Sequence, residues 1–239
     1  MNSKRESVFV WSGKIRLFHW LNVTAILLLI AIGVVILNAK IFGVSTDGKI
    51  LLKTIHVLVG YVFAANLIFR LIVAFTGKTY ERWGKILPFY KGFIRELIEF
   101  SQHKKLRYKG HNPAGKLMVL ALLSLMSVQM VSGLVIAGTD IYYPPFGHYF
   151  KHSIAIDKDS LEVIKPYSKG NVDEKSYQAM RSFRKPFITA HVYSFYCLLL
   201  LIPLHVIGVI VAERREQSAI VSAMVNGYKY LPKDESTNQ

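Results

Sequence analysis

Four long runs of apolar residues constrain this sequence more than any other feature. They cover about residues 17–37, 55–75, 117–137 and 187–212. Each run is long enough to cross a bilayer, because about 20 apolar residues span the hydrocarbon core at a rise of about 1.5 Å per helical residue. The runs leave too little chain for a separate soluble enzyme domain. The sequence therefore predicts an all-α integral membrane protein, a four-helix transmembrane bundle that forms a single domain over residues 1–239.

Basic residues are distributed unevenly between the connections. If the N-terminus is cytoplasmic, the cytoplasmic segments carry 18 Lys and Arg residues and the opposite side carries 11. The positive-inside rule then favours an N-in/C-in topology. In that topology the basic connection 76–116 is cytoplasmic and contains an amphipathic segment around Phe93–Phe100, whereas residues 138–186 form a long external loop. The net charge of +15 is expected to meet anionic lipid headgroups or an acidic partner protein, not nucleic acid.

Two histidines lie in the last apolar run, which contains no charged residue. His191 and His205 are 14 residues apart, close to four helical turns, so they share nearly one face of a helix about 21 Å apart along its axis. A histidine inside a membrane span is costly unless it is satisfied, so it indicates a functional site. Because successive spans alternate in direction, His205 is expected at the depth of His19, and His191 at the depth of His56.

Two facing imidazoles at each depth suit a six-coordinate haem iron. With both axial positions filled, oxygen cannot bind readily, so electron transfer is the expected role. Helix–helix hydrogen bonding and proton relay are the alternatives. Zinc suits the pairs less well, because no cysteine or carboxylate accompanies them. The chain has one cysteine and no C-x-x-C-H motif, so any haem would be held non-covalently.

Other polar residues lie near the ends of the spans. Arg16 and Lys53 are placed near the inner and outer haem edges, where they would either pair with haem propionates or snorkel to lipid headgroups. His111, which precedes Asn-Pro at the start of the third run, would either cap that helix or contact a quinone or a haem propionate. Arg70, near the inner end of the second run, is expected to snorkel to the headgroups.

Three further histidines are less informative. His148 and His152 have the i, i+4 spacing that could bind a metal on a helix, but a solvated loop is expected there. His103 is expected at the surface.

Several motifs resemble the prokaryotic cytochrome b561 family. They are RLFHWLN around His19, HVLVGY with a following FR around His56, GHNPAG before the third run, and H-x13-H on the fourth. The segment RREQSAIVSAMVNGYKY after the fourth run resembles, more narrowly, the b-type cytochrome subunit of membrane-bound nickel–iron hydrogenases.

This resemblance implies a di-haem b subunit of the bacterial inner membrane that passes electrons between an extracytoplasmic redox protein and the quinone pool. His19 and His205 would bind the inner haem iron, and His56 and His191 the outer one. The partner would be similar to a hydrogenase small subunit. The external loop departs from the hydrogenase pattern, so a multihaem cytochrome c is an alternative partner. A stand-alone quinol or superoxide oxidoreductase is the rival within the family, and a haem-free transporter or proton relay is the rival outside it.

Overall fold

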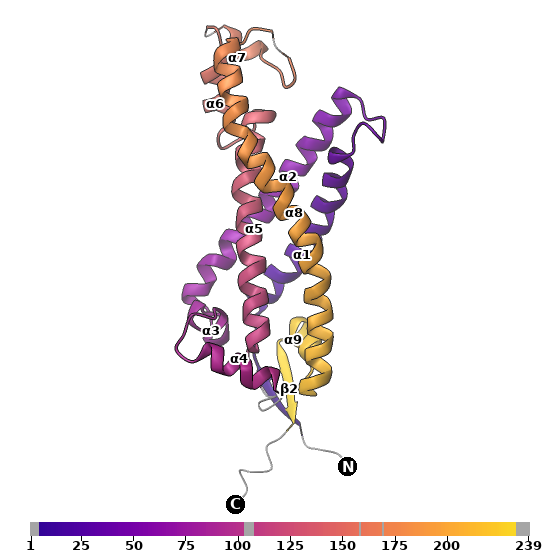
Figure 1. Cartoon of the computed structure of the whole chain (residues 1–239), viewed down its shortest axis with the longest axis vertical. Coiled ribbons are helices and arrows are strands. Elements are labelled where there is room, and N and C mark those ends of the chain that lie inside the picture. Colours follow the sequence, from indigo (N-terminus) through magenta and orange to yellow (C-terminus); the bar gives the residue numbers. More distant parts are fainter. Residues whose placement is uncertain (1–4, 103–107, 158, 169, 233–239) are drawn as a thin grey trace, which may run out of the picture. The chain divides into compact units, whose positions relative to one another are not determined.

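The computed structural model of the chain is dominated by four long helices (Figure 1). It describes residues 5–102, 108–157, 159–168 and 170–232, so His103 lies outside the described residues. The four helices are α1 (Gly13–Leu37), α2 (Thr46–Thr76), α5 (Pro113–Asp140) and α8 (Glu174–Glu216). All four are long and apolar enough to cross a membrane. Each contains one of the predicted apolar runs and extends beyond it, so a mostly helical membrane protein is confirmed.

The long helices expose apolar side chains on their outer faces. Large exposed residues occur on every one of them, including Leu17, Leu28, Ile72, Val131 and Leu200. An aqueous surface of this kind would be unfavourable, because burial of apolar area from water is worth about 25 cal/mol per Å². Hydrocarbon around the helices removes that cost, which is the arrangement expected of a membrane bundle.

Polar side chains define where two of the long helices begin. Asn112 caps α5, since its Oδ1 accepts the backbone N–H of Gly115 at 2.7 Å, and Pro113 occupies the first helical position. Asp173 caps α8 in the same way, accepting the backbone N–H of Ser176 at 2.8 Å. These caps satisfy amide groups that have no partner inside the helix.

The chain forms two compact units. Unit 1 comprises residues 1–21, 66–124 and 198–239, and unit 2 comprises residues 22–65 and 125–197. Each of the four long helices contributes a segment to both units. The two members of each predicted histidine pair therefore belong to the same unit: His19 and His205 to unit 1, His56 and His191 to unit 2.

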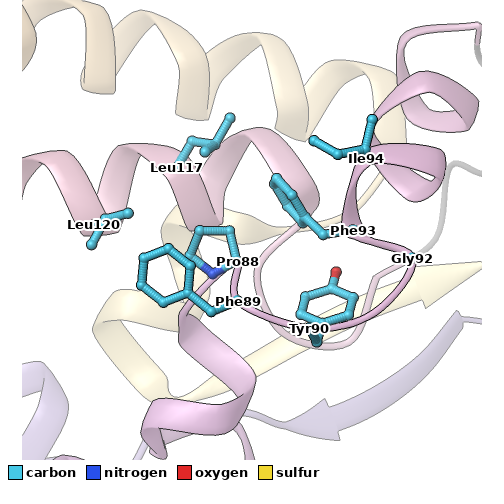
Figure 2. A pocket seen from close by; sticks show the side chains of 8 residues that line it. All are labelled: Pro88, Phe89, Tyr90, Gly92, Phe93, Ile94, Leu117 and Leu120. Carbon is cyan, nitrogen blue, oxygen red and sulfur yellow. The ribbon is translucent and has the colours of Figure 1, made fainter.

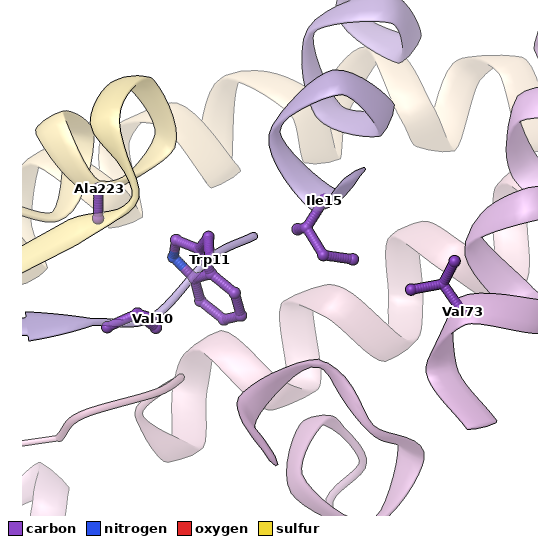
Figure 3. Packing of buried hydrophobic residues seen from close by; sticks show 5 residues of the cluster. All are labelled: Val10, Trp11, Ile15, Val73 and Ala223. Atoms are coloured by element: carbon purple, nitrogen blue, oxygen red, sulfur yellow. The ribbon is translucent and has the colours of Figure 1, made fainter. Parts of the chain in front are cut away.

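Unit 1 contains most of the short elements. They are β1 (Arg5–Phe9), the 3-10 helix η1 (Thr79–Glu81), α3 (Trp83–Ile86), α4 (Phe93–Ser101), α9 (Ile220–Asn226) and β2 (Tyr228–Pro232). A small buried cluster joins the segment after β1 to α1, α2 and α9, as Figure 3 shows; it consists of Val10, Trp11, Ile15, Val73 and Ala223. Gly227 then turns the chain into β2 with a φ of 91°, and a Cβ there would lie 2.7 Å from the Trp11 carbonyl oxygen. Glycine is therefore required at this turn.

Unit 1 contains a short sheet that the sequence did not predict, and it corrects the position expected for Arg70. The chain is not purely helical, because β1 and β2 pair antiparallel from Arg5–Pro232 to Phe9–Tyr228. Each strand is five residues long, too short for a sequence pattern to reveal a partner more than 200 residues away. Arg70 does not snorkel: it is 5% exposed, inside the protein.

The connection between α5 and α8 is more ordered than a loop. The fourth long helix begins at Glu174, so the residues between α5 and α8 are 141–173 and not 138–186. This connection contains α6 (Gly147–Ile154) and α7 (Ser160–Val163). It has a small core of its own with the start of α8, formed by Ile154, Ile164, Val172 and Met180. His148 and His152 lie on α6, so the loop expected for them is wrong. The centroids of their rings are 4.3 Å apart.

Candidate haem sites

In unit 2, α2 and α8 bring two imidazoles to one place. The ring centroids of His56 and His191 are 6.4 Å apart, with 68° between the ring planes. An imidazole nitrogen binds a first-row metal at about 2.0 Å and the ring centroid lies about 1.2 Å behind it, so two imidazoles on opposite sides of one iron have centroids about 6.4 Å apart. The pair therefore has the spacing that a single iron with two axial histidines requires.

Ser132 of α5 determines the state of the His191 ring. Its Oγ lies 3.0 Å from His191 Nδ1 and 2.5 Å from the carbonyl oxygen of Val128. The single hydroxyl proton is donated to Val128, so Ser132 Oγ must accept from Nδ1–H of His191. This assigns the proton to Nδ1 and leaves the lone pair of Nε2 available to a metal, the usual arrangement of a metal-binding histidine.

The backbone around this pair comes close to the rings. A Cβ on Gly133 would lie 3.3 Å from His191 Cε1, and one on Gly33 would lie 3.4 Å from His56 Cε1. Gln129 Nε2 donates to the His191 carbonyl oxygen at 2.9 Å. Glycines on α1 and α5 thus let the helices approach each imidazole, while Gln129 fixes α5 against α8.

In unit 1, His19 of α1 and His205 of α8 form the second pair. The two imidazoles lie within electrostatic range of one another. His19 Nδ1 is enclosed by protein and has no hydrogen-bond partner among the described residues, and the indole of Trp20 packs edge-on with its ring centroid 5.1 Å from that of His19. Trp20 Nε1 in turn donates to the carbonyl oxygen of Met224 at 2.9 Å, which holds α9 beside α1.

Arg16 and Lys53, the two predicted propionate contacts, both have partners in the protein. Arg16 Nη1 donates to the carbonyl oxygen of Val225, and Arg16 Nε is enclosed without a partner. Lys53 Nζ contacts the Asp140 carboxylate and the Tyr167 hydroxyl. Arg184 joins this network, since its Nη1 donates to Asp140 Oδ1 at 2.6 Å.

His111 does not cap α5, because Asn112 does. Its ring packs on Trp11 with a centroid separation of 4.8 Å. His111 Nδ1 is enclosed and has no hydrogen-bond partner in the part of the chain that the structure describes, although part of the residue remains accessible. Burial lowers the pKa of His111 to about 3, so the imidazole is neutral at physiological pH.

These sites suit haem better than a metal ion bound by side chains alone. In the described part of the chain, no three His, Cys, Asp or Glu side chains gather into a metal site. Two histidines fill only two coordination positions, so the others must come from the cofactor, as they do in a porphyrin. The Cβ positions of Gly60, one turn from His56, and Gly208, one turn from His205, face open space. The spacing of His56 and His191 and the open space beside the two glycines therefore fit a haem.

An apolar pocket of about 440 Å³ lies elsewhere in unit 1, away from these histidines (Figure 2). It is formed by the segment before α4, by α4 and by the start of α5, and is lined by Pro88, Phe89, Tyr90, Gly92, Phe93, Ile94, Leu117 and Leu120. At its edge Lys116 Nζ donates to Tyr90 Oη at 2.9 Å, and Tyr90 contacts Glu96. None of the four paired histidines lines it.

A sequence profile described as prokaryotic cytochrome b561 matches residues 10–227, nearly the whole chain. The chain belongs to the prokaryotic cytochrome b561 family. It is accordingly a multi-pass protein of the bacterial inner membrane. No solved structure gives a significant match.

Similar proteins carry one shared description, "Probable Ni/Fe-hydrogenase B-type cytochrome subunit". The protein from Rhizobium leguminosarum bv. viciae is 28% identical over 164 residues, which cover 62% of this chain and 69% of the relative. The protein from Rhodobacter capsulatus is 27% identical over 143 residues, covering 54% and 55%. The one from Cupriavidus necator is 26% identical over 137 residues, covering 53% and 56%. The chain thus spans little more than half the length of most of these relatives.

Sequence reasoning missed the residues that support the histidines. Gly133 and Gly33 carry no signal of their own, because contacts between α5 and α8 or α1 and α2 cannot be read from spacing within one helix. The polar residues of the third run gave a weak signal, since Gln129 and Ser132 are among its few hydrogen-bonding side chains.

Proposed function

We propose that this chain is a di-haem b electron-transfer subunit, with one haem bound by His56 and His191 and the other by His19 and His205. The observation that carries the proposal is the first pair: the ring centroids are 6.4 Å apart, and Ser132 Oγ lies 3.0 Å from His191 Nδ1, where it can accept from an Nδ1–H. A proton relay would need neither feature. The family match supports the same assignment, because the relatives are described as b-type cytochromes.

The protein's own residues have three tasks. The histidines hold the iron in place, and Ser132 and Gln129 orient His191. The apolar helices exclude water from the sites. Haem held by these histidines would supply reversible one-electron chemistry.

We further propose an N-in/C-in orientation, with electrons passing between an extracytoplasmic redox protein and the quinone pool. The excess of Lys and Arg on the segments that would face the cytoplasm supports this orientation. The connection 141–173 would then face outward, and its own small core makes it a stable surface for a partner. The descriptions of the relatives favour a hydrogenase as partner, and a cytochrome c is the alternative.

Two cations would serve the haem carboxylates in this proposal. Arg16 lies three residues before His19 and keeps an enclosed, unpartnered Nε. Lys53 lies three residues before His56, and with Arg184 it gives the Asp140 network two positive charges for one negative charge. One positive charge is thus left uncompensated near the start of α2. In this proposal the start of α2 lies beside the outer haem.

The experiment is a reduced-minus-oxidised spectrum with haem quantification on the wild type and on four single variants, His19→Ala, His56→Ala, His191→Ala and His205→Ala. Each variant is expected to retain one of two haems b, and the two variants of a pair are expected to lose the same haem, identified by its midpoint potential. Loss of different haems within a pair would overturn the pairing. A folded wild type without haem would favour a transporter or proton relay.

The response to an extracytoplasmic redox partner distinguishes an electron-transfer subunit from a stand-alone oxidoreductase. A subunit is expected to be reduced rapidly by its extracytoplasmic redox protein and to lose that reduction when α6 and α7 are replaced by a short linker. Rapid turnover with quinol or superoxide alone, unaffected by the replacement, would support the stand-alone enzyme.

A further inference from the structure

Arg70 is buried in unit 1, within electrostatic range of the Glu81 carboxylate but without a direct hydrogen bond to it among the described residues. Among the described residues it makes one hydrogen bond, from Nη1 to the Glu81 carbonyl oxygen at 3.3 Å. The Glu81 carboxylate is engaged elsewhere, since its two oxygens accept the backbone N–H groups of Ser12 at 2.8 Å and Lys78 at 3.0 Å. A guanidinium has five N–H donors and a permanent charge, and burying it without a direct partner is costly.

The register of α2 places Arg70 close to the level of His19. One turn before Arg70, Asn66 Nδ2 donates to the carbonyl oxygen of Phe18 at 3.0 Å, beside His19. Three residues after Arg70, Val73 belongs to the buried cluster of Figure 3. Arg70 therefore lies between the histidine and the start of α1, about one helical turn from the level of the imidazole.

His111 lies in the same region of unit 1. It is within electrostatic range of both Arg70 and His205. Its Nδ1 is enclosed without a partner, and its ring is fixed against Trp11. A guanidinium and a neutral imidazole thus lie near one another in the unit that contains the His19–His205 pair.

We propose that Arg70 and His111 form a buried carboxylate-binding site for a propionate of the haem held by His19 and His205. The proposal rests on the proposed function, because it requires that haem. Arginine suits the site, since its planar fork matches a carboxylate through two parallel hydrogen bonds, and His111 can donate a third. A haem carries two propionates, and Arg16 is available for the other one.

The test compares Arg70→Gln with Arg82→Gln in the full-length, haem-loaded protein in lipid nanodiscs. Arg82 is a matched control, because its Nε also donates to a backbone carbonyl oxygen, that of Gly77 at 2.7 Å, but at an exposed position. Haem labelled with ¹³C at its propionate carboxyls is followed by redox-induced infrared difference spectroscopy. The propionate bands of one haem are expected to shift in Arg70→Gln and to stay unchanged in Arg82→Gln.

A redox titration of the same samples gives a second readout. Removing a buried positive charge favours the more positive ferric state, so one of the two midpoint potentials is expected to fall in Arg70→Gln while the other stays constant. Unchanged propionate bands and potentials at full haem content would overturn the inference.

If Arg70→Gln does not fold, Arg70→Lys serves in its place. Lysine keeps the charge but not the paired geometry, so a band shift with little change in potential is expected, and unshifted bands would overturn the inference. A folded wild type without haem would overturn the proposed function itself, which keeps the two failures distinguishable.

Discussion

Replacing Ser132 by alanine tests the geometry of the His56–His191 site most specifically. Ser132 is 2% exposed, and its Oγ is the acceptor for Nδ1–H of His191 at 3.0 Å. The variant leaves that N–H without a partner in a buried place, which costs about 1–2 kcal/mol. If the full cost falls on the haem complex, the affinity of the protein for one haem is expected to fall about 5- to 30-fold.

The same change should alter the electron density on the iron. An acceptor on Nδ1–H makes the imidazole a stronger donor to the metal and so stabilises the ferric state. Ser132→Ala is therefore expected to raise one midpoint potential and leave the other unchanged in a spectroelectrochemical titration.

Ser194→Ala is the matched control. Ser194 is also a buried serine, and its Oγ donates to the Ala190 carbonyl oxygen at 2.7 Å, one turn along α8 from His191. Haem affinity and both potentials are expected to stay near wild type in this control. Equal effects of Ser132→Ala and Ser194→Ala would refute the role assigned to Ser132.

Three other perturbations have defined outcomes. Lys229→Met leaves the buried Glu216 carboxylate without its cation, because Lys229 Nζ lies 2.9 Å from it. The free energy of unfolding, measured by chemical denaturation, is expected to fall by about 3–5 kcal/mol. Unchanged stability would contradict the contact. Gly133→Val places methyl groups beside His191, where even a Cβ would lie 3.3 Å from Cε1. One haem is therefore expected to be lost, or to become high-spin in the absorption spectrum. Two unchanged low-spin haems would argue against this packing. Hydrogen bonds from Ser176 hold the pKa of Asp173 below its ordinary value of 3.8, so its contribution to the first turn of α8 is present above pH 3.8 and is lost as the pH falls through the depressed pKa. Hydrogen exchange at the start of α8 should show this acid-induced opening in wild type and not in Asp173→Asn, and identical pH profiles would exclude the carboxylate as its cause.

The sequence was sufficient for the features that depend on one helix at a time. The four apolar runs predicted α1, α2, α5 and α8, because hydrocarbon thickness fixes how many apolar residues a span needs. The pairing of His19 with His205 and of His56 with His191 rests on the same reasoning, because successive helices alternate in direction, and it stays a prediction.

Features that depend on contacts between distant segments were not predictable. Arg70 was expected at the headgroups because it lies near the end of an apolar run, yet α2 continues to Thr76 and the segment from Thr79 to Glu81 packs over it. Residues 228–232 pair with β1 from the other end of the chain, a contact that no pattern within either segment reveals. Ser132 had no detectable role until α5 and α8 were seen together.

The central claim is that each chain holds two haems b, each between two histidines from different helices. Pyridine haemochrome quantification against protein mass, on wild type purified in mild detergent, measures this directly. The account predicts two haems b per chain with low-spin, six-coordinate absorption spectra in both oxidation states. One haem or none in a folded preparation, or a high-spin iron open to external ligands, would contradict it.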